Sequence, residues 1–300
     1  MSKLVVENIR VNSLENSQGV NLATLSADGK FIFNGSVSVP VQNLQTWTST
    51  TRPDPPQDGL IGFNETTKAV EQYLTSNSRW VKVQKFAAPI VRDGLIMYLD
   101  AGDPNSYPGT GSFWRDLSGK CNHMFLRNID FDSDYGGVLR CNGSSGSYGE
   151  SVWFNMTNSD CTVMTATRYT GFGNNNRGRM VNARSNNWLL GQWSNAVNKY
   201  YAQGWVSSSS SGGSDNTWRI YAGTGDRDSD QWQLYTNAQS IAGPRNGGSR
   251  GPNGLRFGVY QNFGEVTDGQ CGFILGYNRV LTQAEIQQNY DYFKGRYGLT

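Results

Sequence analysis

Short apolar runs separated by glycine-containing turns recur along the whole chain. The 300 residues include 36 glycines, 15 tyrosines, 13 phenylalanines and 9 tryptophans, whereas only 17% are Asp, Glu, Lys or Arg. Disordered chains carry much charge and few aromatic residues, and helical bundles are rich in Ala, Leu, Glu and Lys. The pattern therefore predicts an all-β protein.

Charge and hydropathy argue against two classes of partner. The formal net charge is +2, and the Lys and Arg residues are scattered rather than clustered, so we expect no nucleic acid partner. No apolar run approaches the length of a membrane span, so we expect no membrane partner. The first residues, MSKLVVENIRVNS, lack the apolar core of a secretory signal, which predicts synthesis in a cytosol.

Residues 1–45 alternate weakly between apolar and polar positions. The turns SADGK and NGS contain Asp-Gly and Asn-Gly, which favour hairpins, and FIF between them is typical of a strand. Strands this short, with few large apolar side chains, cannot offset their own conformational entropy. The segment is predicted to be a small β arm that needs a partner: the rest of the chain, another copy, or a larger assembly.

Residues 46–88 are predicted to form a small β meander. Three prolines give an extended lead-in, and the runs GLIGFN, AVEQYL and RWVKVQ follow with turns between them. The unit resembles a small module of phage appendage proteins. The residues that carry this resemblance are Gly59, Asn64, Thr67, Glu71, Tyr73, Trp80 and Val81. An ordinary β meander with an aromatic core is the alternative interpretation.

A third unit is predicted to span residues 92–300. Its first run, LIMYL at 95–99, is apolar on both faces, which indicates a strand buried on both sides. Asp100 and the turn-forming residues up to Ser106 then direct the chain into a loop. In the following turn, WRDLSGK, Trp114 and Leu117 are expected to be apolar anchors.

Both ends of this unit resemble the LamG-like, concanavalin A-type lectin/glucanase domains. The matching residues at the start are Gly94, Leu95, Leu99, Asp100, Ala101, Ser106, Tyr107, Trp114, Asp116, Leu117, Ser118 and Gly119. At the other end, QWQLYTNAQSI at 231–241 resembles a hairpin of these domains, and residues 272–299 resemble their closing strand and terminal helix. The resemblance implies a jelly-roll β-sandwich with one terminal helix, but no single function, because this fold serves many.

The terminal helix also has direct support in the sequence. Thr282 and Glu285 have the spacing of a capping box, and Ile286, Tyr290 and Phe293 then fall on one face of a helix. Gly295 and Gly298 are expected to end the helix.

The acidic residues give no support to catalysis. Retaining glucanases of this fold carry Glu-x-Asp-x-x-Glu on one strand, and this string does not occur here. The glutamates beyond residue 92 are Glu150, Glu265 and Glu285, and the single histidine, His123, is expected to lie in a loop rather than act as a base. We predict that the protein is not an enzyme, with a glycan-active hydrolase as the alternative.

No cofactor is expected. The cysteines Cys121, Cys141, Cys161 and Cys271 form no CxxC pair, and a zinc site is improbable with one histidine. We expect four buried thiols in strands, with one or two disulfides as the alternative. Calcium has weak support in the acidic loop at 223–230, which is more simply a solvated hairpin loop, and no better support at Asp100 and Asp103.

Candidate glycan-binding residues gather in the stretch GFGNNNRGRMVNARSNNW at 171–188. Lectins use Asn, Asp and Arg for sugar hydroxyls and flat aromatic rings for sugar faces. The candidates are Asn174, Asn175, Asn176, Arg177, Arg179, Asn187 and Trp188. Asparagine is also common in the turns of long β connections, so a purely structural loop is the alternative. The polar stretch at 205–218 is expected to be a mobile hairpin tip, and the tryptophans are expected mainly in the core.

Together, the two resemblances imply a bacteriophage virion protein, either a tail fibre or adhesin, or a capsid decoration or head-fibre protein. Residues 1–88 would attach to other virion proteins, and residues 92–300 would display a lectin-like domain toward a host-surface glycan. Such a protein would assemble in the host cytoplasm as a homo-oligomer; a trimer is preferred, and a dimer or a monomeric subunit is the alternative. A bacterial surface adhesin is the rival interpretation, which the missing signal sequence disfavours.

Overall fold

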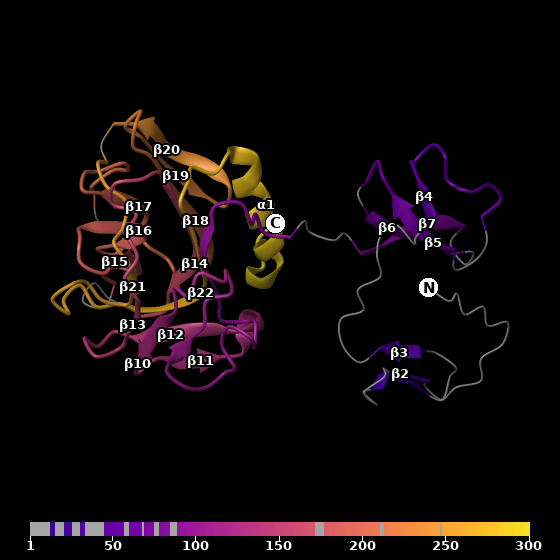
Figure 1. Ribbon diagram of the computed structural model, residues 1–300, viewed down its shortest axis with the longest axis horizontal. Helices are drawn as coiled ribbons and strands as arrows, with labels where there is room; N and C mark the ends of the chain where they lie inside the picture. The colour runs from indigo at the N-terminus through magenta and orange to yellow at the C-terminus, as the bar shows by residue number, and fades with distance from the viewer. Residues whose placement is uncertain are drawn as a thin grey trace. The chain divides into compact units, whose positions relative to one another are not determined.

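The computed structural model describes residues 13–15, 21–25, 31–33, 45–56, 60–67, 69–74, 78–84, 89–171, 177–210, 213–246 and 248–300. The chain divides into two units, residues 1–86 and 87–300, and each is described by itself. Strands predominate in both (Figure 1), so the predicted all-β class is confirmed.

The first unit contains two small sheets. The strands β1 (Ser13–Glu15), β2 (Asn21–Leu25) and β3 (Phe31–Phe33) form an antiparallel three-stranded sheet. The second sheet has the order β4 (Gln45–Trp47), β5 (Ile61–Asn64), β6 (Ala69–Leu74) and β7 (Arg79–Gln84). The predicted meander is β5 to β7, and β4 adds a fourth strand that runs parallel to β5 and was not predicted.

A buried carboxylate organises the second of these sheets. Glu71 is 2% exposed and accepts hydrogen bonds from Arg52 Nε and from Asn64 Nδ2, each at 2.9 Å. The Trp47 ring packs on Gly62, where a Cβ atom would lie 2.1 Å from the ring, so only glycine fits there. Asn64 and Glu71, two residues of the motif that resembles the phage module, are thus hydrogen-bonded to each other, and the Trp47 indole also donates to Glu71.

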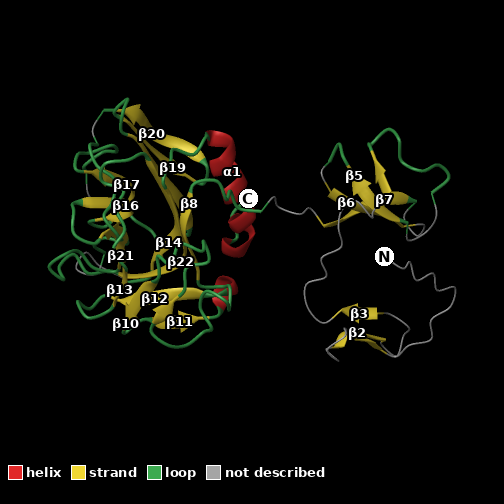
Figure 2. Cartoon of the chain, in the orientation of Figure 1, coloured by secondary structure: helices red, strands yellow, loops and turns green. Residues whose placement is uncertain are grey.

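Residues 87–300 form a jelly-roll β-sandwich of two antiparallel sheets (Figure 2). One sheet has the order β17 (Ala196–Ala202), β16 (Trp188–Trp193), β15 (Val181–Ala183), β21 (Leu255–Phe257), β13 (Tyr148–Ser151), β10 (Met124–Arg127) and β9 (Phe113–Trp114). The other has the order β11 (Asp130–Asp132), β12 (Val138–Asn142), β22 (Asp268–Tyr277), β14 (Cys161–Tyr169), β18 (Arg219–Asp226), β19 (Gln231–Thr236) and β20 (Gln239–Arg245). An eighth strand, β8 (Leu95–Asp100), pairs with the half of β22 that β12 leaves free.

The eight-stranded sheet is buried on both faces. On its inner face, side chains such as Met97 and Ile274 join the main core between the two sheets. On its outer face, Phe273 and Leu275 pack against the helix α1 (Gln283–Phe293), which covers this side of the sandwich (Figure 1). Strand β8 lies between these two cores and is almost entirely buried. The prediction of a strand at 95–99 that is buried on both sides is confirmed.

Helix α1 begins at the predicted capping box. The Glu285 amide donates to Thr282 Oγ1 at 3.3 Å, and the Thr282 amide donates to Glu285 Oε2 at 2.8 Å. The predicted apolar stripe of Ile286, Tyr290 and Phe293 is buried. The helix is eleven residues long, and no helix within the described part of the chain could cross a membrane.

The end of the helix differs from the prediction. A 3-10 turn (Lys294–Tyr297) continues directly from α1, and Gly295 lies inside it rather than ending the helix. Gly298 ends this turn in the left-handed conformation, with a φ of 66°, which glycine adopts without steric cost.

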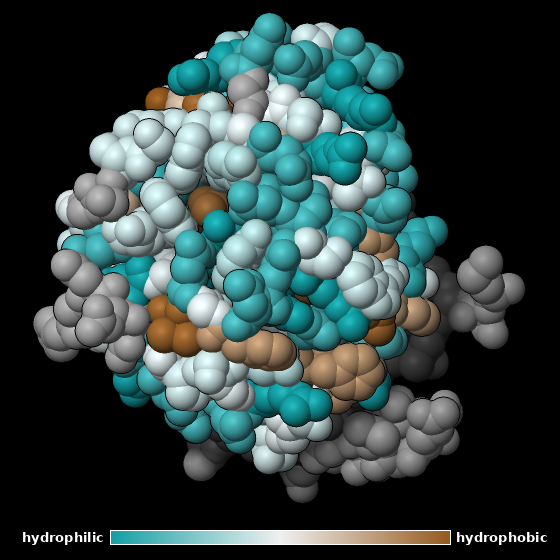
Figure 3. Space-filling view, turned by 90° about the vertical axis from the view of Figure 1, so that its left-hand side faces the viewer, coloured by the Kyte–Doolittle hydropathy of each residue, from teal (hydrophilic) through white to brown (hydrophobic). Residues whose placement is uncertain are grey.

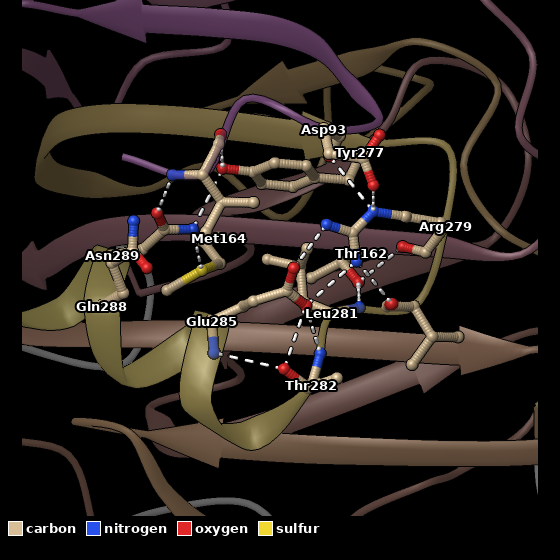
Figure 4. A network of polar contacts seen from close by, with 12 residues as sticks. Asp93, Thr162, Met164, Tyr277, Arg279, Leu281, Thr282, Glu285, Gln288 and Asn289 are labelled. Carbon is tan, nitrogen blue, oxygen red and sulfur yellow. Dashed lines mark hydrogen bonds and ion pairs between the residues drawn. The ribbon is translucent and has the colours of Figure 1, made fainter. Parts of the chain in front are cut away.

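Polar side chains fix the helix on the sheet (Figure 4). Asn289 is fully buried; its Nδ2 donates to Tyr277 Oη at 3.0 Å and its Oδ1 accepts from the Val91 amide at 2.9 Å. Nearby, Arg279 forms ion pairs with Glu285 at 2.6 Å and with Asp93 at 2.9 Å. The network joins the beginning and the end of this unit.

The polar stretch at 205–218 does not form the predicted hairpin tip. It follows β17, which pairs with β16 in the seven-stranded sheet, and precedes β18, which pairs with β14 and β19 in the other sheet. The stretch therefore crosses from one sheet to the other. The sequence pattern could not reveal this, because it shows two tryptophan-bearing strands but not their pairing.

The buried ion pair of the first unit predicts a pH dependence. Hydrogen bonds from Arg52 lower the pKa of Glu71 from 4.5 to about 2, against the opposing effect of burial. A carboxylate with a lowered folded-state pKa stabilises the fold above its unfolded pKa, and this contribution is lost as the pH falls from about 5 to about 2. Calorimetry of the full chain should show the first unit losing about 3 kcal/mol over this window.

The matched variants for this experiment are Glu71→Gln and Glu65→Gln. Glu65 is exposed in the same unit, so its variant should keep the acid-dependent loss. Glu71→Gln should be less stable at pH 7 and nearly independent of pH between 5 and 3. An unchanged acid transition in Glu71→Gln contradicts the assignment.

Candidate functional site

The structure gives the predicted glycan-binding loop a largely structural role. Asn174, Asn175 and Asn176 lie outside the described residues. Arg177 is 9% exposed, and its guanidinium donates to the Gly171 carbonyl, to Asn195 Oδ1 and to Asn216 Oδ1 at 2.7–3.1 Å. Its hydrogen bonds join three connecting segments, so the side chain acts as a brace between loops.

Arg179 and Asn187 also face each other rather than solvent. Arg179 is 6% exposed, donates to Asn187 Oδ1 at 2.7 Å and pairs with Glu265. Its guanidinium carbon lies 3.7 Å from the centre of the Tyr260 ring. The two candidates therefore contact each other, and these polar groups are used within the protein.

Trp188 is fully buried and packs edge-on against Tyr200, with 5.7 Å between ring centroids. Its side chain points into the main core because residues alternate along β16 and Leu190 lies on the same face. Trp188 is therefore wrong as a sugar-stacking residue in this structure. The sequence could not distinguish a core tryptophan from an exposed one at a loop-to-strand boundary.

The remaining predicted sites serve the fold. His123 Nδ1 accepts a hydrogen bond from the Asp116 amide at 3.0 Å, and Trp232 Nε1 donates to Asp230 Oδ1 at the same distance. Asp100 pairs with Arg296 at 2.6 Å. Among the described residues, no cluster of three or more His, Cys, Asp or Glu side chains could hold a metal.

Three of the four cysteines match the prediction of buried thiols in strands. Cys141, Cys161 and Cys271 are free and buried, and burial raises the pKa of each thiol to about 12. Cys121 is the exception, because it is exposed in the loop before β10 with a φ of 59°.

The outer face of the seven-stranded sheet holds a different group of residues, seen from outside in Figure 3. Met124, Leu126 and Phe257 point into the core, so alternation places their neighbours on the opposite side. We call the resulting surface the outer aromatic face. It consists of Phe125, Arg127, Tyr148, Glu150, Trp153, Arg184, Arg256 and Phe263. Apolar side chains gather in the lower part of Figure 3, over the end of the sheet that holds β10 and β13.

Glu150 is the centre of the outer aromatic face. One carboxylate oxygen lies 3.0 Å from a guanidinium nitrogen of Arg184, and the other is bound by Arg256 from the neighbouring strand. Arg184 also donates to the Ser151 carbonyl at 2.9 Å. A carboxylate shared by two arginines fixes both guanidinium planes, because charge-assisted hydrogen bonds are strong and directional.

An exposed aromatic ring packs against each of these arginines. The guanidinium carbon of Arg184 lies 4.2 Å from the centre of the Trp153 ring, and Trp153 is 60% exposed. The corresponding distance from Arg256 to the Phe263 ring is 5.6 Å, and Phe263 is 47% exposed. Arg256 also lies 5.5 Å from the Tyr148 ring. An arginine therefore lies against one side of each ring, and a large area of Trp153 and of Phe263 remains open to solvent.

A surface pocket of about 250 Å³ adjoins Trp153. Its other lining residues are Phe154, Asn155 and Asn253. Both amide oxygens are used within the protein: Asn253 Oδ1 accepts from the Ser185 and Asn186 amides, and Asn155 Oδ1 accepts from Thr157. The pocket therefore offers a ligand mainly the Trp153 ring. Sequence analysis missed this site; Glu150 was considered only as a catalytic candidate, and Trp153 was expected in the core. The available signal was the alternation along YGES (148–151), which places Tyr148 and Glu150 together on one face of the strand.

Comparisons with known proteins give information on the fold. The sequence matches no family model and no curated protein. Among solved structures, it is similar to a mutant of Trypanosoma rangeli sialidase that displays trans-sialidase activity, with 18% identity over 71% of this chain and 35% of that chain, and a TM-score of 0.51. It is also similar to the binding domain of Paraclostridial Mosquitocidal Protein 1 (15% identity, 69% and 56% covered, TM-score 0.49) and to the receptor-binding domain of botulinum neurotoxin type G (15%, 66% and 51%, 0.46).

The match to the sialidase mutant supports the overall fold and nothing finer. At such identities the likeness concerns the fold alone, and the chain spans between about a third and just over half of the length of these structures. The resemblances to LamG-like domains and to phage appendage proteins rest on the sequence motifs.

Two tryptophans make a matched test of the site. Trp188→Ala should lower the free energy of unfolding by about 3–5 kcal/mol, because it leaves a cavity in the core. Trp153→Ala should cost less than about 1 kcal/mol, because the ring is exposed. Urea unfolding of the full chain measures both values. Similar losses for the two variants would show that Trp153 is a packing residue rather than an exposed platform.

Proposed function

We propose that the protein is a non-enzymatic attachment protein that binds glycans through the outer aromatic face. The observation that carries this proposal is Trp153, a largely exposed ring held on Arg184, which Glu150 fixes in turn. Exposing an indole to water forgoes the favourable free energy of its burial, and preorganised exposed aromatic residues are typical of binding sites.

The chemistry of the outer aromatic face suits a sugar. Trp153 and Phe263 offer flat apolar surfaces to the C–H faces of pyranose rings, and the Asn155 and Asn253 amides line the pocket beside Trp153. Because the ion pairs hold the rings in place before binding, little side-chain entropy remains to be lost on association.

The three glutamates of residues 87–300 favour binding over hydrolysis. Glycosidases generally need an acid and a second carboxylate on either side of the scissile bond. Glu150, Glu265 and Glu285 are each paired with arginine. The oxygens of each of these carboxylates are therefore already engaged by a guanidinium.

The setting we propose is a bacteriophage virion, with the protein as a tail fibre or as a capsid decoration. Residues 1–88 would dock onto other virion proteins, and a homotrimer would place three outer aromatic faces together. Support comes from the sequence resemblances and from the division of the chain into two units.

The docking role is tested by removing residues 1–45. The truncated protein should sediment as a folded monomer and should no longer join particles. Normal incorporation of the truncated protein into virions would rule out the docking role.

Glycan binding is tested by titrating the full chain with bacterial envelope polysaccharides. Trp153→Ala should weaken binding about fivefold or more, since stacking on an aromatic ring is worth about 1–3 kcal/mol. Glu150→Gln should also weaken binding, because both arginines lose their shared partner. Phe131→Ala is the matched control, since Phe131 is an exposed ring on β11 of the other sheet.

Three results count against the proposal. Equal loss of binding in Phe131→Ala would indicate a non-specific effect, and full binding by Trp153→Ala would place the site elsewhere. Release of reducing ends that a single Glu or Asp substitution abolishes would show a hydrolase instead.

A further inference from the structure

The outer aromatic face carries an excess of positive charge. Arg184 and Arg256 share the single carboxylate of Glu150. A third arginine, Arg127, lies on the same face, because it pairs with Tyr148 across β10 and β13 and is exposed. Within the described part of the chain, Arg127 forms no ion pair. Three arginines against one carboxylate leave two positive charges on this face, as many as the formal net charge of the whole chain.

Arg256 has a donor that the protein does not use. Its side chain is 8% exposed, and its Nε–H has no hydrogen-bond partner among the described residues. Its Nη1 reaches only the Tyr260 and Gln261 carbonyls, at the long distances of 3.4 and 3.3 Å. Leaving a buried charged donor unsatisfied is costly, so the bond to Glu150 does not meet the full hydrogen-bonding capacity of this guanidinium.

We propose that the outer aromatic face recognises an acidic saccharide, with a carboxylate of the glycan bound by Arg127 and by the arginines around Glu150. This inference rests on the glycan-binding function proposed above and specifies its ligand class. Arginine binds carboxylates in a planar, two-pronged geometry, and its charge does not depend on pH in the physiological range.

The charge arrangement favours an acidic ligand over a neutral one. A neutral sugar would cover Trp153 and Phe263 but would leave the excess positive charge uncompensated while removing water from it. A carboxylate-bearing sugar uses both the rings and the charge. Single-stranded nucleic acid also combines rings with negative charge, but it requires a longer basic track than three arginines on one face provide.

The experiment compares acidic polymers with their own neutral forms. The full chain is titrated with hyaluronan, alginate and polygalacturonate, and with each polymer after reduction of its carboxyl groups to alcohols. At least one acidic polymer should bind about tenfold or more tightly than its reduced form, and this preference should shrink as salt is added.

Two variants with the same change in charge locate the effect. Arg127→Gln should weaken binding of the acidic polymer severalfold more than binding of the reduced form. Arg227→Gln is the control, because Arg227 is exposed in the turn between β18 and β19 of the other sheet. It should leave both affinities close to those of the unchanged protein.

The outcomes separate this inference from the proposed function. Equal affinity for acidic and reduced polymers, with binding that still depends on Trp153, overturns the inference and keeps the function. Binding of none of the six polymers counts against both. Tighter binding of a single-stranded oligonucleotide than of any saccharide overturns the inference in favour of a nucleic acid ligand.

Discussion

Burial of the eight-stranded sheet on both of its faces is the constraint on which the rest of the sandwich depends. Its inner face joins the core between the sheets, and its outer face packs under helix α1, where the Phe273 and Phe293 rings stack with 3.8 Å between their centroids. Strands such as β8 and β22 must therefore be apolar on both sides. The broad sheet face left for polar and aromatic side chains is the outer face of the seven-stranded sheet, which is where the proposed site lies.

On that face a single carboxylate has a disproportionate effect. Glu150 binds two arginines, and each arginine supports an exposed ring, so one side chain sets the geometry of Trp153 and Phe263 together. The arrangement differs from a catalytic carboxylate, which needs a partner that can share or release a proton. It also explains why a glutamate on this fold need not indicate a glucanase: its neighbours decide its role.

Local signals predicted much of the fold. Residues 95–99 were apolar without alternation, and the spacing of Thr282 and Glu285 defined the start of α1, because both depend on neighbouring residues. The pairing of β4 with β5 and the crossing of 205–218 between sheets depend on residues far apart in the chain. The proposed site was harder still, because alternation along residues 148–151 separates the two faces of the strand but does not say which face is buried, and Trp153 lies beyond that strand. Arg177, Arg179 and Asn187 were proposed as glycan-binding residues, and in the structure their side chains hold loops together.

The ordering of Arg184 and Arg256 by Glu150 is tested most directly by NMR of the arginine guanidinium groups. In the unchanged protein, both groups should give distinct signals that are shifted by the ring currents of Trp153 and Phe263, while the signal of Arg127 stays close to that of a free arginine. In Glu150→Gln, the signals of Arg184 and Arg256 should both move toward the free value. If both keep their shifts in that variant, Glu150 does not organise the site, and the rings are held by other contacts.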